Sequence, residues 1–299
     1  MCIRDSSGIG PEDSLRSNAI TPIKVIPAVG QNLMDHLEIY LQRSCPRENS
    51  LNRWLNPLGR AMIGSRWLVR KTGLGSTNHF EVGGFIRSRQ GIDAPDIQFH
   101  FLPAAVTYDG SVTHGSSGFQ VHVGPMQSPS RGHITLRSAD PRDKPLVRFN
   151  YMNHTSDWEV FRQAVRLARE IFQQPQLDRY SGEELSPGLQ CDSDEGIDAF
   201  IRNNAESAYH PCGTCRMGIG EATVVDHTCR VHGLENLRVV DASVFPQITN
   251  GNLNAPTIML AEKVADQIKG EPARQENQPY FMDPYSETRQ RPGEPQRQM

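Results

Sequence analysis

The chain has 299 residues, and 31 Lys+Arg nearly balance 34 Asp+Glu, so the formal net charge is -3. This balance excludes the broad positive field with which proteins attract nucleic acid or an anionic membrane surface. The length suffices for about two domains, no apolar run approaches the ~18 residues of a membrane-spanning helix, and six cysteines do not make a disulfide scaffold. We expect a cytoplasmic protein with no nucleic-acid partner; peripheral membrane association stays open.

The two ends of the chain differ from its middle. Residues 1–6 show no hydrophobic periodicity, and residues 271–299 are polar and rich in proline. A segment of that composition cannot bury enough apolar surface to offset the entropy of ordering it. We expect 271–299 to be a disordered tail.

Glycines punctuate two early runs, residues 7–11 and 30–37. They indicate either ordinary turns or backbone packed closely against a strand or a ligand. Further on, Glu81 is the carboxylate of an otherwise apolar run, 78–86. Because ionised carboxylates are rarely buried without a partner, Glu81 is either an exposed charge at a strand edge or a buried anion that receives a cation.

Alternating apolar and polar residues predict strands over 97–102 and 119–123, and again over 131–138 and 146–149. Loops rather than helices join these strands. We therefore expect an antiparallel sheet with one covered face.

Besides a shorter helix, which begins near Asp192 and Glu195 and carries Ile197, Phe200 and Ile201, two longer helices are predicted after the strands. One begins at the candidate N-cap Ser156, carries an apolar stripe that includes Phe161, and ends before Pro175. The other begins at Pro256 and stops at Gly270.

His210 lies between Tyr209 and Pro211, and proline restricts the backbone of the residue before it. A histidine held on stiff backbone can be aimed as a general base, although a buried structural histidine is the commoner case. Asn254 lies beside the start of the last predicted helix, whose free N–H groups favour negative charge.

Cys212 and Cys215 form a C-x-x-C pair, but a structural zinc site needs four ligands and no second pair follows. The glycines around the pair argue against the helix start of a redox motif. We therefore expect no metal site and interpret both cysteines as packing residues.

These runs together resemble the glucose–methanol–choline (GMC) family of FAD-dependent oxidoreductases. The matching runs lie, in this order, at residues 7–11, 30–36, 78–81, 130–141, 210–218, 240–243 and 252–257. The resemblance implies an α+β architecture, in which an antiparallel-sheet substrate domain backed by helices lies beside a truncated α/β FAD-binding domain. That second domain would lack its N-terminal Rossmann βαβ unit, so the chain would be a C-terminal fragment.

The resemblance also implies a division of the chain. Residues 1–38 would be a remnant of the FAD-binding domain, with a non-native start at 1–6. Residues 39–235 would form the substrate-binding domain, and 236–270 a strand and helix that return to the FAD-binding domain.

Roles for single residues follow from the same resemblance. His210 matches the histidine that takes or shares the proton of the substrate hydroxyl, and Asn254 matches the position that hydrogen-bonds the same oxygen. Glu81 matches a carboxylate that faces a trimethylammonium group, and His100 matches a further histidine of the substrate pocket. The residues expected against FAD are Asp241, Ala242, Asn252, Leu253, Ala255 and Pro256.

The activity that the resemblance implies is FAD-dependent oxidation of choline to betaine aldehyde, and further oxidation to glycine betaine stays open. Two alternatives are a GMC alcohol dehydrogenase with another substrate and a flavin-free inactive fragment. The sequence identifies neither the electron acceptor nor any contact with the inner membrane.

Overall fold

The computed structural model describes residues 5–89, 92, 94–107 and 117–272. The expected non-native start at 1–6 and the expected tail at 271–299 lie for the most part outside these residues. Of the described residues, 5–36, 126–157 and 207–272 form one compact unit, unit 1, and 37–125 and 158–206 form a second, unit 2. The functional division expected at residues 38, 235 and 270 stays a prediction.

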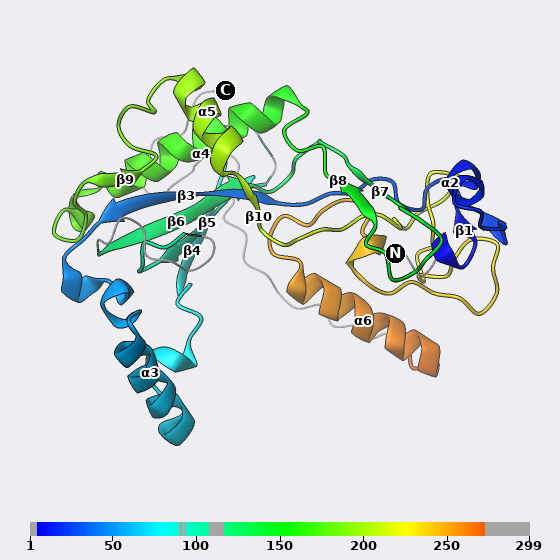
Figure 1. Ribbon diagram of the computed structural model, residues 1–299, viewed down its shortest axis with the longest axis horizontal. Helices are drawn as coiled ribbons and strands as arrows, with labels where there is room; N and C mark the ends of the chain where they lie inside the picture. The colour runs from blue at the N-terminus through cyan, green and yellow to red at the C-terminus, as the bar shows by residue number, and fades with distance from the viewer. Residues whose placement is uncertain (1–4, 90–91, 93, 108–116, 273–299) are drawn as a thin grey trace. The chain divides into compact units, whose positions relative to one another are not determined.

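Unit 2 is built on a six-stranded sheet (Figure 1). Its strands are β3 (Leu37–Ser44), β4 (Val82–Ile86), β5 (Ile97–Leu102), β6 (Gly118–Pro125), β9 (Glu184–Ser186) and β10 (Glu206–Ser207). The order is β10-β3-β6-β5-β4, with β9 also paired to β3. The pairs β3–β6, β6–β5 and β5–β4 are antiparallel, which confirms the expected antiparallel sheet and the strands predicted over 97–102 and 119–123.

On β3 the buried side chains Leu37, Ile39 and Leu41 follow the period of two that an extended chain imposes, whereas β6 is buried at nearly every residue. Ile39 and Leu41 on β3 are fully buried, as is Val121 on β6, and Val123 is 1% exposed. Ile39 lies opposite Val123 and Leu41 opposite Val121. Direct pairing of buried side chains fixes the register of these two strands.

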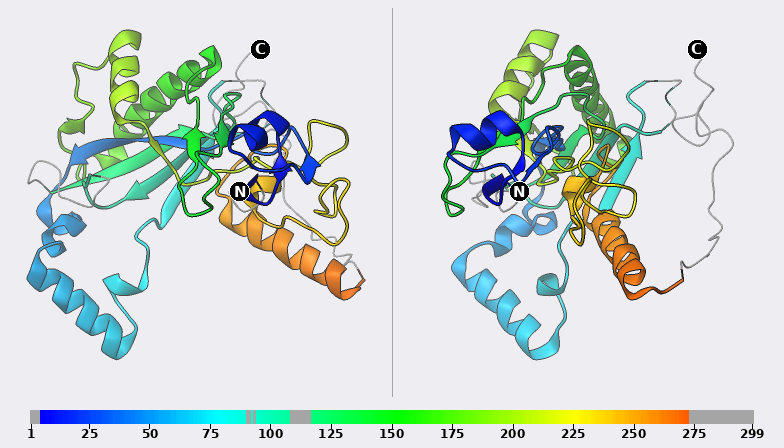
Figure 2. Two further views of the ribbon diagram at one scale, coloured as in Figure 1. Left: turned by 45° about the vertical axis from the view of Figure 1, so that its right-hand side comes forward. Right: turned by 90° about the vertical axis from the view of Figure 1, so that its right-hand side faces the viewer.

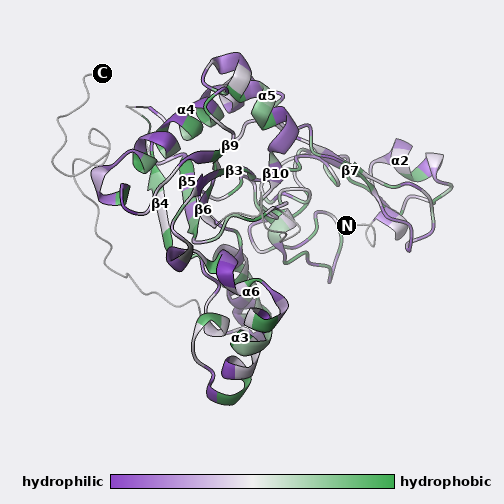
Figure 3. Ribbon diagram, turned by 60° about the vertical axis from the view of Figure 1, so that its left-hand side comes forward, coloured by the Kyte–Doolittle hydropathy of each residue, from purple (hydrophilic) through white to green (hydrophobic). Residues whose placement is uncertain are grey.

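Helices α4 (Thr155–Phe172) and α5 (Asp194–Asn204) cover one face of this sheet (Figures 1 and 2), whereas α3 (Pro57–Arg70) projects away from it. Apolar and polar positions interleave along α4 (Figure 3). Phe161 and Val165 on its apolar face are fully buried, and burying a side chain such as Phe161 contributes about 1.5–3 kcal/mol. The helix begins one residue before the expected N-cap Ser156.

A bidentate ion pair joins α4 to α5. The Nε and Nη2 atoms of Arg162 donate to the two carboxylate oxygens of Asp198, at 2.7 and 2.6 Å. Ser193 caps α5, because its Oγ accepts the N–H of Gly196 at 3.2 Å. Short 3₁₀ helices complete unit 2: η1 (Arg47–Asn49), η2 (Leu51–Trp54), η3 (Leu74–Ser76) and η5 (Pro175–Leu177).

Unit 1 contains short elements joined by long loops. They are β1 (Ile9–Gly10), α2 (Glu12–Ser17), β2 (Lys24–Val25), β7 (His133–Thr135), β8 (Leu146–Arg148), η6 (Ala242–Val244) and α6 (Asn254–Lys269). β1 pairs in parallel with β2, and β7 pairs antiparallel with β8. The strands expected over 131–138 and 146–149 therefore form a separate ribbon and do not belong to the large sheet, which corrects the expectation of one sheet.

Gly132 explains how tightly this ribbon is packed. A Cβ at Gly132 would lie 2.1 Å from the carbonyl oxygen of Arg148, so only glycine lets the two backbones approach. The residues of β8 are themselves exposed. The ribbon is thus held by close backbone contact rather than by a buried face.

Loop residues form most of the core of unit 1. Cys215, Val224, Val225, Cys229 and Val244 are fully buried within one apolar cluster. The cysteines of this cluster are free thiols that pack as small apolar side chains. Among the described residues, no helix has the length and apolar character that crossing a bilayer requires.

Candidate active site

His210 is held by its backbone on both sides. Tyr209 before it has φ of 60°, a left-handed conformation that bulky residues rarely adopt, and Pro211 follows it. The N–H of His210 donates to Asp35 Oδ1 at 2.9 Å, and the N–H of Ala208 donates to the carbonyl oxygen of His36 at 2.9 Å. A strained, fully anchored segment of this kind is typical of functional sites.

Asp35 is the anchor of this segment. Its buried carboxylate accepts four hydrogen bonds: Oδ1 from the N–H groups of His36 and His210, each at 2.9 Å, and Oδ2 from Tyr151 and Ser207, each at 2.6 Å. Burial and the neighbouring carboxylate both raise the pKa of the Tyr151 phenol. The phenol therefore stays a donor and holds Asp35 in place.

His36 contacts the imidazole of His210 directly. The two Nδ1 atoms are 3.0 Å apart, and the rings meet edge to face with centroids 5.0 Å apart. On its other side, Nε2 of His36 lies 2.9 Å from the carbonyl oxygen of Met126. Burial is the main cause that lowers the pKa of His36 from 6.5 to about 4, and His210 lowers it further. His36 is therefore neutral at physiological pH.

A carboxamide faces the remaining nitrogen of His210. Asn252 Nδ2 lies 3.2 Å from His210 Nε2, so an expected cofactor-contact residue meets the expected base. Asn254 is the first residue of α6, which begins two residues earlier than expected, and its side chain is exposed. Between them Leu253 is buried and packs with Met34 and Cys212, which fixes the turn that carries both carboxamides.

Asp241 and Ala242, two residues expected against FAD, line a cavity of about 300 Å³ in unit 1. The cavity is completed by Leu33, Ile134, Pro211, Cys212, Thr214 and Ser243. Asp241 caps η6 by accepting the N–H of Ser243 at 2.8 Å. The lining combines a carboxylate, two hydroxyls and apolar walls, which fits a polyhydroxylated chain carrying a flat ring. Of the other expected contacts, Ala255 is exposed and Pro256 half-buried in the first turn of α6.

Backbone hydrogen bonds connect this cavity to the His210 segment. The N–H groups of Gly213, Cys215 and Met217 donate to the carbonyls of three consecutive residues, 242–244. Burial raises the pKa of the Cys212 thiol to about 12, with Asp35 adding to the effect. Cys212 is therefore an inert wall rather than a nucleophile.

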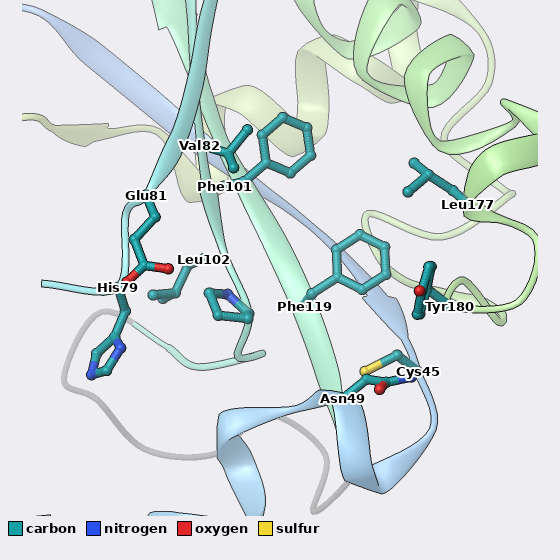
Figure 4. A pocket seen from close by; sticks show the side chains of 11 residues that line it. Cys45, Asn49, His79, Glu81, Val82, Phe101, Leu102, Phe119, Leu177 and Tyr180 are labelled. Carbon is teal, nitrogen blue, oxygen red and sulfur yellow. The ribbon is translucent and has the colours of Figure 1, made fainter. Parts of the chain in front are cut away.

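Glu81 lies in unit 2, beside an apolar cavity of about 440 Å³ (Figure 4). Phe101, Phe119 and Tyr180 supply aromatic walls to this cavity. Glu81 itself is exposed, and its Oε1 accepts the hydroxyl of Thr77 at 2.7 Å. Of the two readings that the sequence left open, the exposed position before β4 is the one observed. His100 is on β5, and its ring meets Phe80 edge to face at 6.2 Å.

A second carboxylate site in unit 2 surrounds His122, and the sequence did not suggest it. Glu38 Oε1 is 3.1 Å from His122 Nδ1, and the ring of Tyr40 stacks on His122 at 3.9 Å. Phe80 meets the same imidazole edge to face at 5.1 Å. Burial and then Glu38 raise the pKa of the nearby Glu206. This site, the Glu38–His122 cluster, brings acids and aromatic faces together.

Local patterns could have found only part of these contacts. Asp35, His36 and Glu38 belong to or adjoin a run that the family resemblance included, but no period or spacing indicated that His36 would meet His210. Among the described residues, no group of three or more His, Cys, Asp or Glu side chains is arranged to hold a metal ion.

Known proteins give a consistent picture of this architecture. A sequence model of the GMC oxidoreductase family matches residues 128–261. The oxygen-dependent choline dehydrogenase of Escherichia coli (strain K12) is 54% identical over 271 residues, covering 91% of this chain and 49% of that protein. Pyridoxine 4-oxidase from Mesorbium loti superposes with a TM-score of 0.74 at 27% identity, covering 90% of this chain and 49% of that one. Formate oxidase superposes at 0.83 with 25% identity, covering 89% and 52%. The chain spans about half the length of these proteins.

Proposed function

We propose that this chain belongs to the GMC oxidoreductase family, as its sequence motifs indicated, and that it is part of a FAD-dependent enzyme that oxidises choline. The observation that carries the proposal is the contact between His210 and Asn252 in the same unit as the cavity lined by Asp241 and Ala242. Acid, hydroxyl and apolar groups around that cavity suit the ribityl arm and ring of a flavin. When bound, the flavin supplies the acceptor for hydride from the alcohol carbon.

The residues of the chain handle the proton. His210 Nε2 takes the proton of the substrate hydroxyl, and a neighbouring carboxamide donates to the oxygen as negative charge develops on it. Asn252 is the carboxamide in hydrogen-bond contact with His210, and Asn254 is the second one carried on the same turn. Leu253 anchors that turn in the core, so the donors need little rearrangement.

The preference for choline rests on cation recognition. A quaternary ammonium group has no N–H to donate, so only negative charge and aromatic faces can select it. Unit 2 offers two such places: Glu81 beside the aromatic cavity, and Glu38 next to Tyr40 and Phe80 in the Glu38–His122 cluster. The 54% identical relative is called a choline dehydrogenase, which agrees with this preference. It is also called oxygen-dependent, so oxygen is the electron acceptor to test first.

A second candidate is a GMC enzyme for an aromatic alcohol. The cavity beside Glu81 has three aromatic walls and mostly apolar lining, which suit a flat ring as well as a trimethylammonium group. The likeness to pyridoxine 4-oxidase favours the same class. The assay must therefore compare both kinds of alcohol.

The test is a turnover assay on this chain joined to the half of the E. coli relative that it does not span, loaded with FAD. Choline is compared with the neutral alcohol in which a tert-butyl group replaces the trimethylammonium group. We expect oxidation of choline at a far lower KM than that of its neutral analogue. Equal KM values would reject cation recognition, and a preparation without flavin absorbance or turnover would reject the proposal altogether.

Two matched variants locate the cation site. Glu81→Gln and Glu38→Gln each remove one negative charge and keep the shape of the side chain. Substitution of the carboxylate that faces the trimethylammonium group should raise KM for choline at least about tenfold. The same substitution should leave KM for the neutral analogue unchanged. If neither variant separates the two alcohols, no carboxylate of these two sites selects the substrate.

A further inference from the structure

A continuous chain of polar contacts runs from the backbone carbonyl of Met126 through the His36 and His210 rings to the Asn252 carboxamide, all within unit 1. The tautomer of each imidazole along such a chain follows from the groups at the ends. A backbone carbonyl can only accept a hydrogen bond. His36 Nε2, at 2.9 Å from the carbonyl oxygen of Met126, must therefore carry a hydrogen.

The state of His36 then fixes that of His210. Burial keeps the pKa of His36 near 4, so at neutral pH its second nitrogen, Nδ1, is a bare acceptor. His210 Nδ1, at 3.0 Å from it, must be the donor of that hydrogen bond. A neutral His210 has only one ring hydrogen, and its Nε2 is consequently bare.

The other end of the chain requires the same arrangement. Asn252 presents its amide nitrogen to His210 Nε2 at 3.2 Å, and an N–H can only be received by a bare nitrogen. Two groups distant in sequence, the Met126 carbonyl and the Asn252 carboxamide, thus select one tautomer independently.

We propose that His36 is a positioning residue that holds His210 in the tautomer with hydrogen on Nδ1, so that Nε2 is the atom that receives the substrate proton. This inference rests on the proposed role of His210 as the base. In that step the O–H bond of the alcohol breaks and an N–H bond forms at Nε2; a bound flavin would be the acceptor for the hydride from carbon. The positive charge then on His210 strengthens its Nδ1–H bond to His36, which is too weak a base to take that proton.

The geometry also explains why the contact persists. Asp35 Oδ1 accepts the backbone N–H of both histidines, so the two rings approach each other from one shared anchor. His36 is 1% exposed, which keeps water from competing for its bare nitrogen. His36 therefore orients the His210 imidazole, as a buried hydrogen-bond partner orients a catalytic histidine in general.

The direct test is nitrogen-15 NMR on the intact chain labelled at histidine, with the His210 signals assigned by their loss in His210→Gln. We expect hydrogen on Nδ1 and a bare Nε2 at neutral pH. In His36→Asn, the carboxamide oxygen can replace the Nδ1 acceptor, so the tautomer should be kept. In His36→Leu no acceptor is present, and His210 should populate the other tautomer. Hydrogen on Nε2 of His210 in the parent chain would overturn the inference.

Kinetics on the FAD-loaded joined protein give the second readout. His36→Leu should lower kcat at least about tenfold with little change in KM, and His36→Asn should restore most of the rate. Equal rates for the parent and His36→Leu, or a loss confined to KM, would refute a positioning role. The NMR readout needs neither flavin nor substrate. The tautomer of His210 can therefore be measured even if the proposed function is wrong. Turnover of choline with the wrong tautomer would reject this inference alone.

Discussion

Replacing His36 by asparagine should change how the stability of the chain depends on pH. In the folded state burial, together with His210, lowers the pKa of His36 from 6.5 to about 4, while Asp35 and the carbonyls of Met126 and Thr249 partly oppose that effect. Between these two pKa values His36 binds a proton in the unfolded chain but not in the folded chain. The free energy of unfolding therefore falls as pH falls. Above pH 6.5 both states are neutral at this residue, and the effect vanishes.

The magnitude follows from the two pKa values. Protonation of the unfolded state lowers the free energy of unfolding by about 2 kcal/mol at pH 5 relative to pH 7.5, and by about 3 kcal/mol at full extent. Asparagine does not titrate, so His36→Asn lacks this loss. The variant should be less stable than the parent by about 1–3 kcal/mol at pH 7.5, because the Met126 carbonyl loses its donor, and the gap should narrow by about 2 kcal/mol at pH 5.

The assay is urea unfolding at the two pH values. Far-UV circular dichroism is the appropriate signal, because Trp54, Trp67 and Trp158 all lie in unit 2 and report poorly on His36 in unit 1. The control is His154→Asn, which changes an exposed histidine. A constant difference between parent and His36→Asn at both pH values would show that His36 titrates normally, and would refute its assignment as a buried neutral acceptor.

Three further outcomes follow from burial and packing. Phe161→Ala should lower the free energy of unfolding by about 3–5 kcal/mol, measured by tryptophan fluorescence, since α4 would lose a fully buried ring. Gly132→Ala should unfold at clearly lower temperature, whereas Gly84→Ala, where a new Cβ meets nothing within 4 Å, should change the melting temperature little. Cys212, with its raised pKa, should resist alkylation at pH 8 in the native chain and react after denaturation, as peptide mass mapping can show; reaction at the native rate of an exposed thiol would contradict its burial.

Local sequence rules predicted the elements whose side chains alternate or recur strongly. The period of two gave β5 and β6, and the apolar stripe around Phe161 gave α4, because burial on one face leaves a regular mark on the sequence. The same rule placed β7 and β8 in the wrong sheet. Alternation shows that a segment is extended, but it does not identify the partner strand, which here depends on the close approach at Gly132.

The candidate site shows the same limit. The proline after His210 indicated a rigid histidine, and the resemblance to the family pointed to the turn that carries Asn252. The meeting of His36 with His210 joins residues 174 positions apart, and no local signal records such a contact. Glu38 was missed because none of the predicted strands covered β3, and no local pattern indicated that His122 would lie beside it.

Asp35 couples the positions of residues that lie far apart in the chain. Tyr151 and Ser207 each donate a hydrogen bond to Asp35 Oδ2, the oxygen opposite the one that holds the backbone of His210. Loss of either hydroxyl would free the carboxylate to rotate. The orientation of the His210 ring would then change, although the ring itself would lose no contact. These positions should therefore vary together or not at all among related chains.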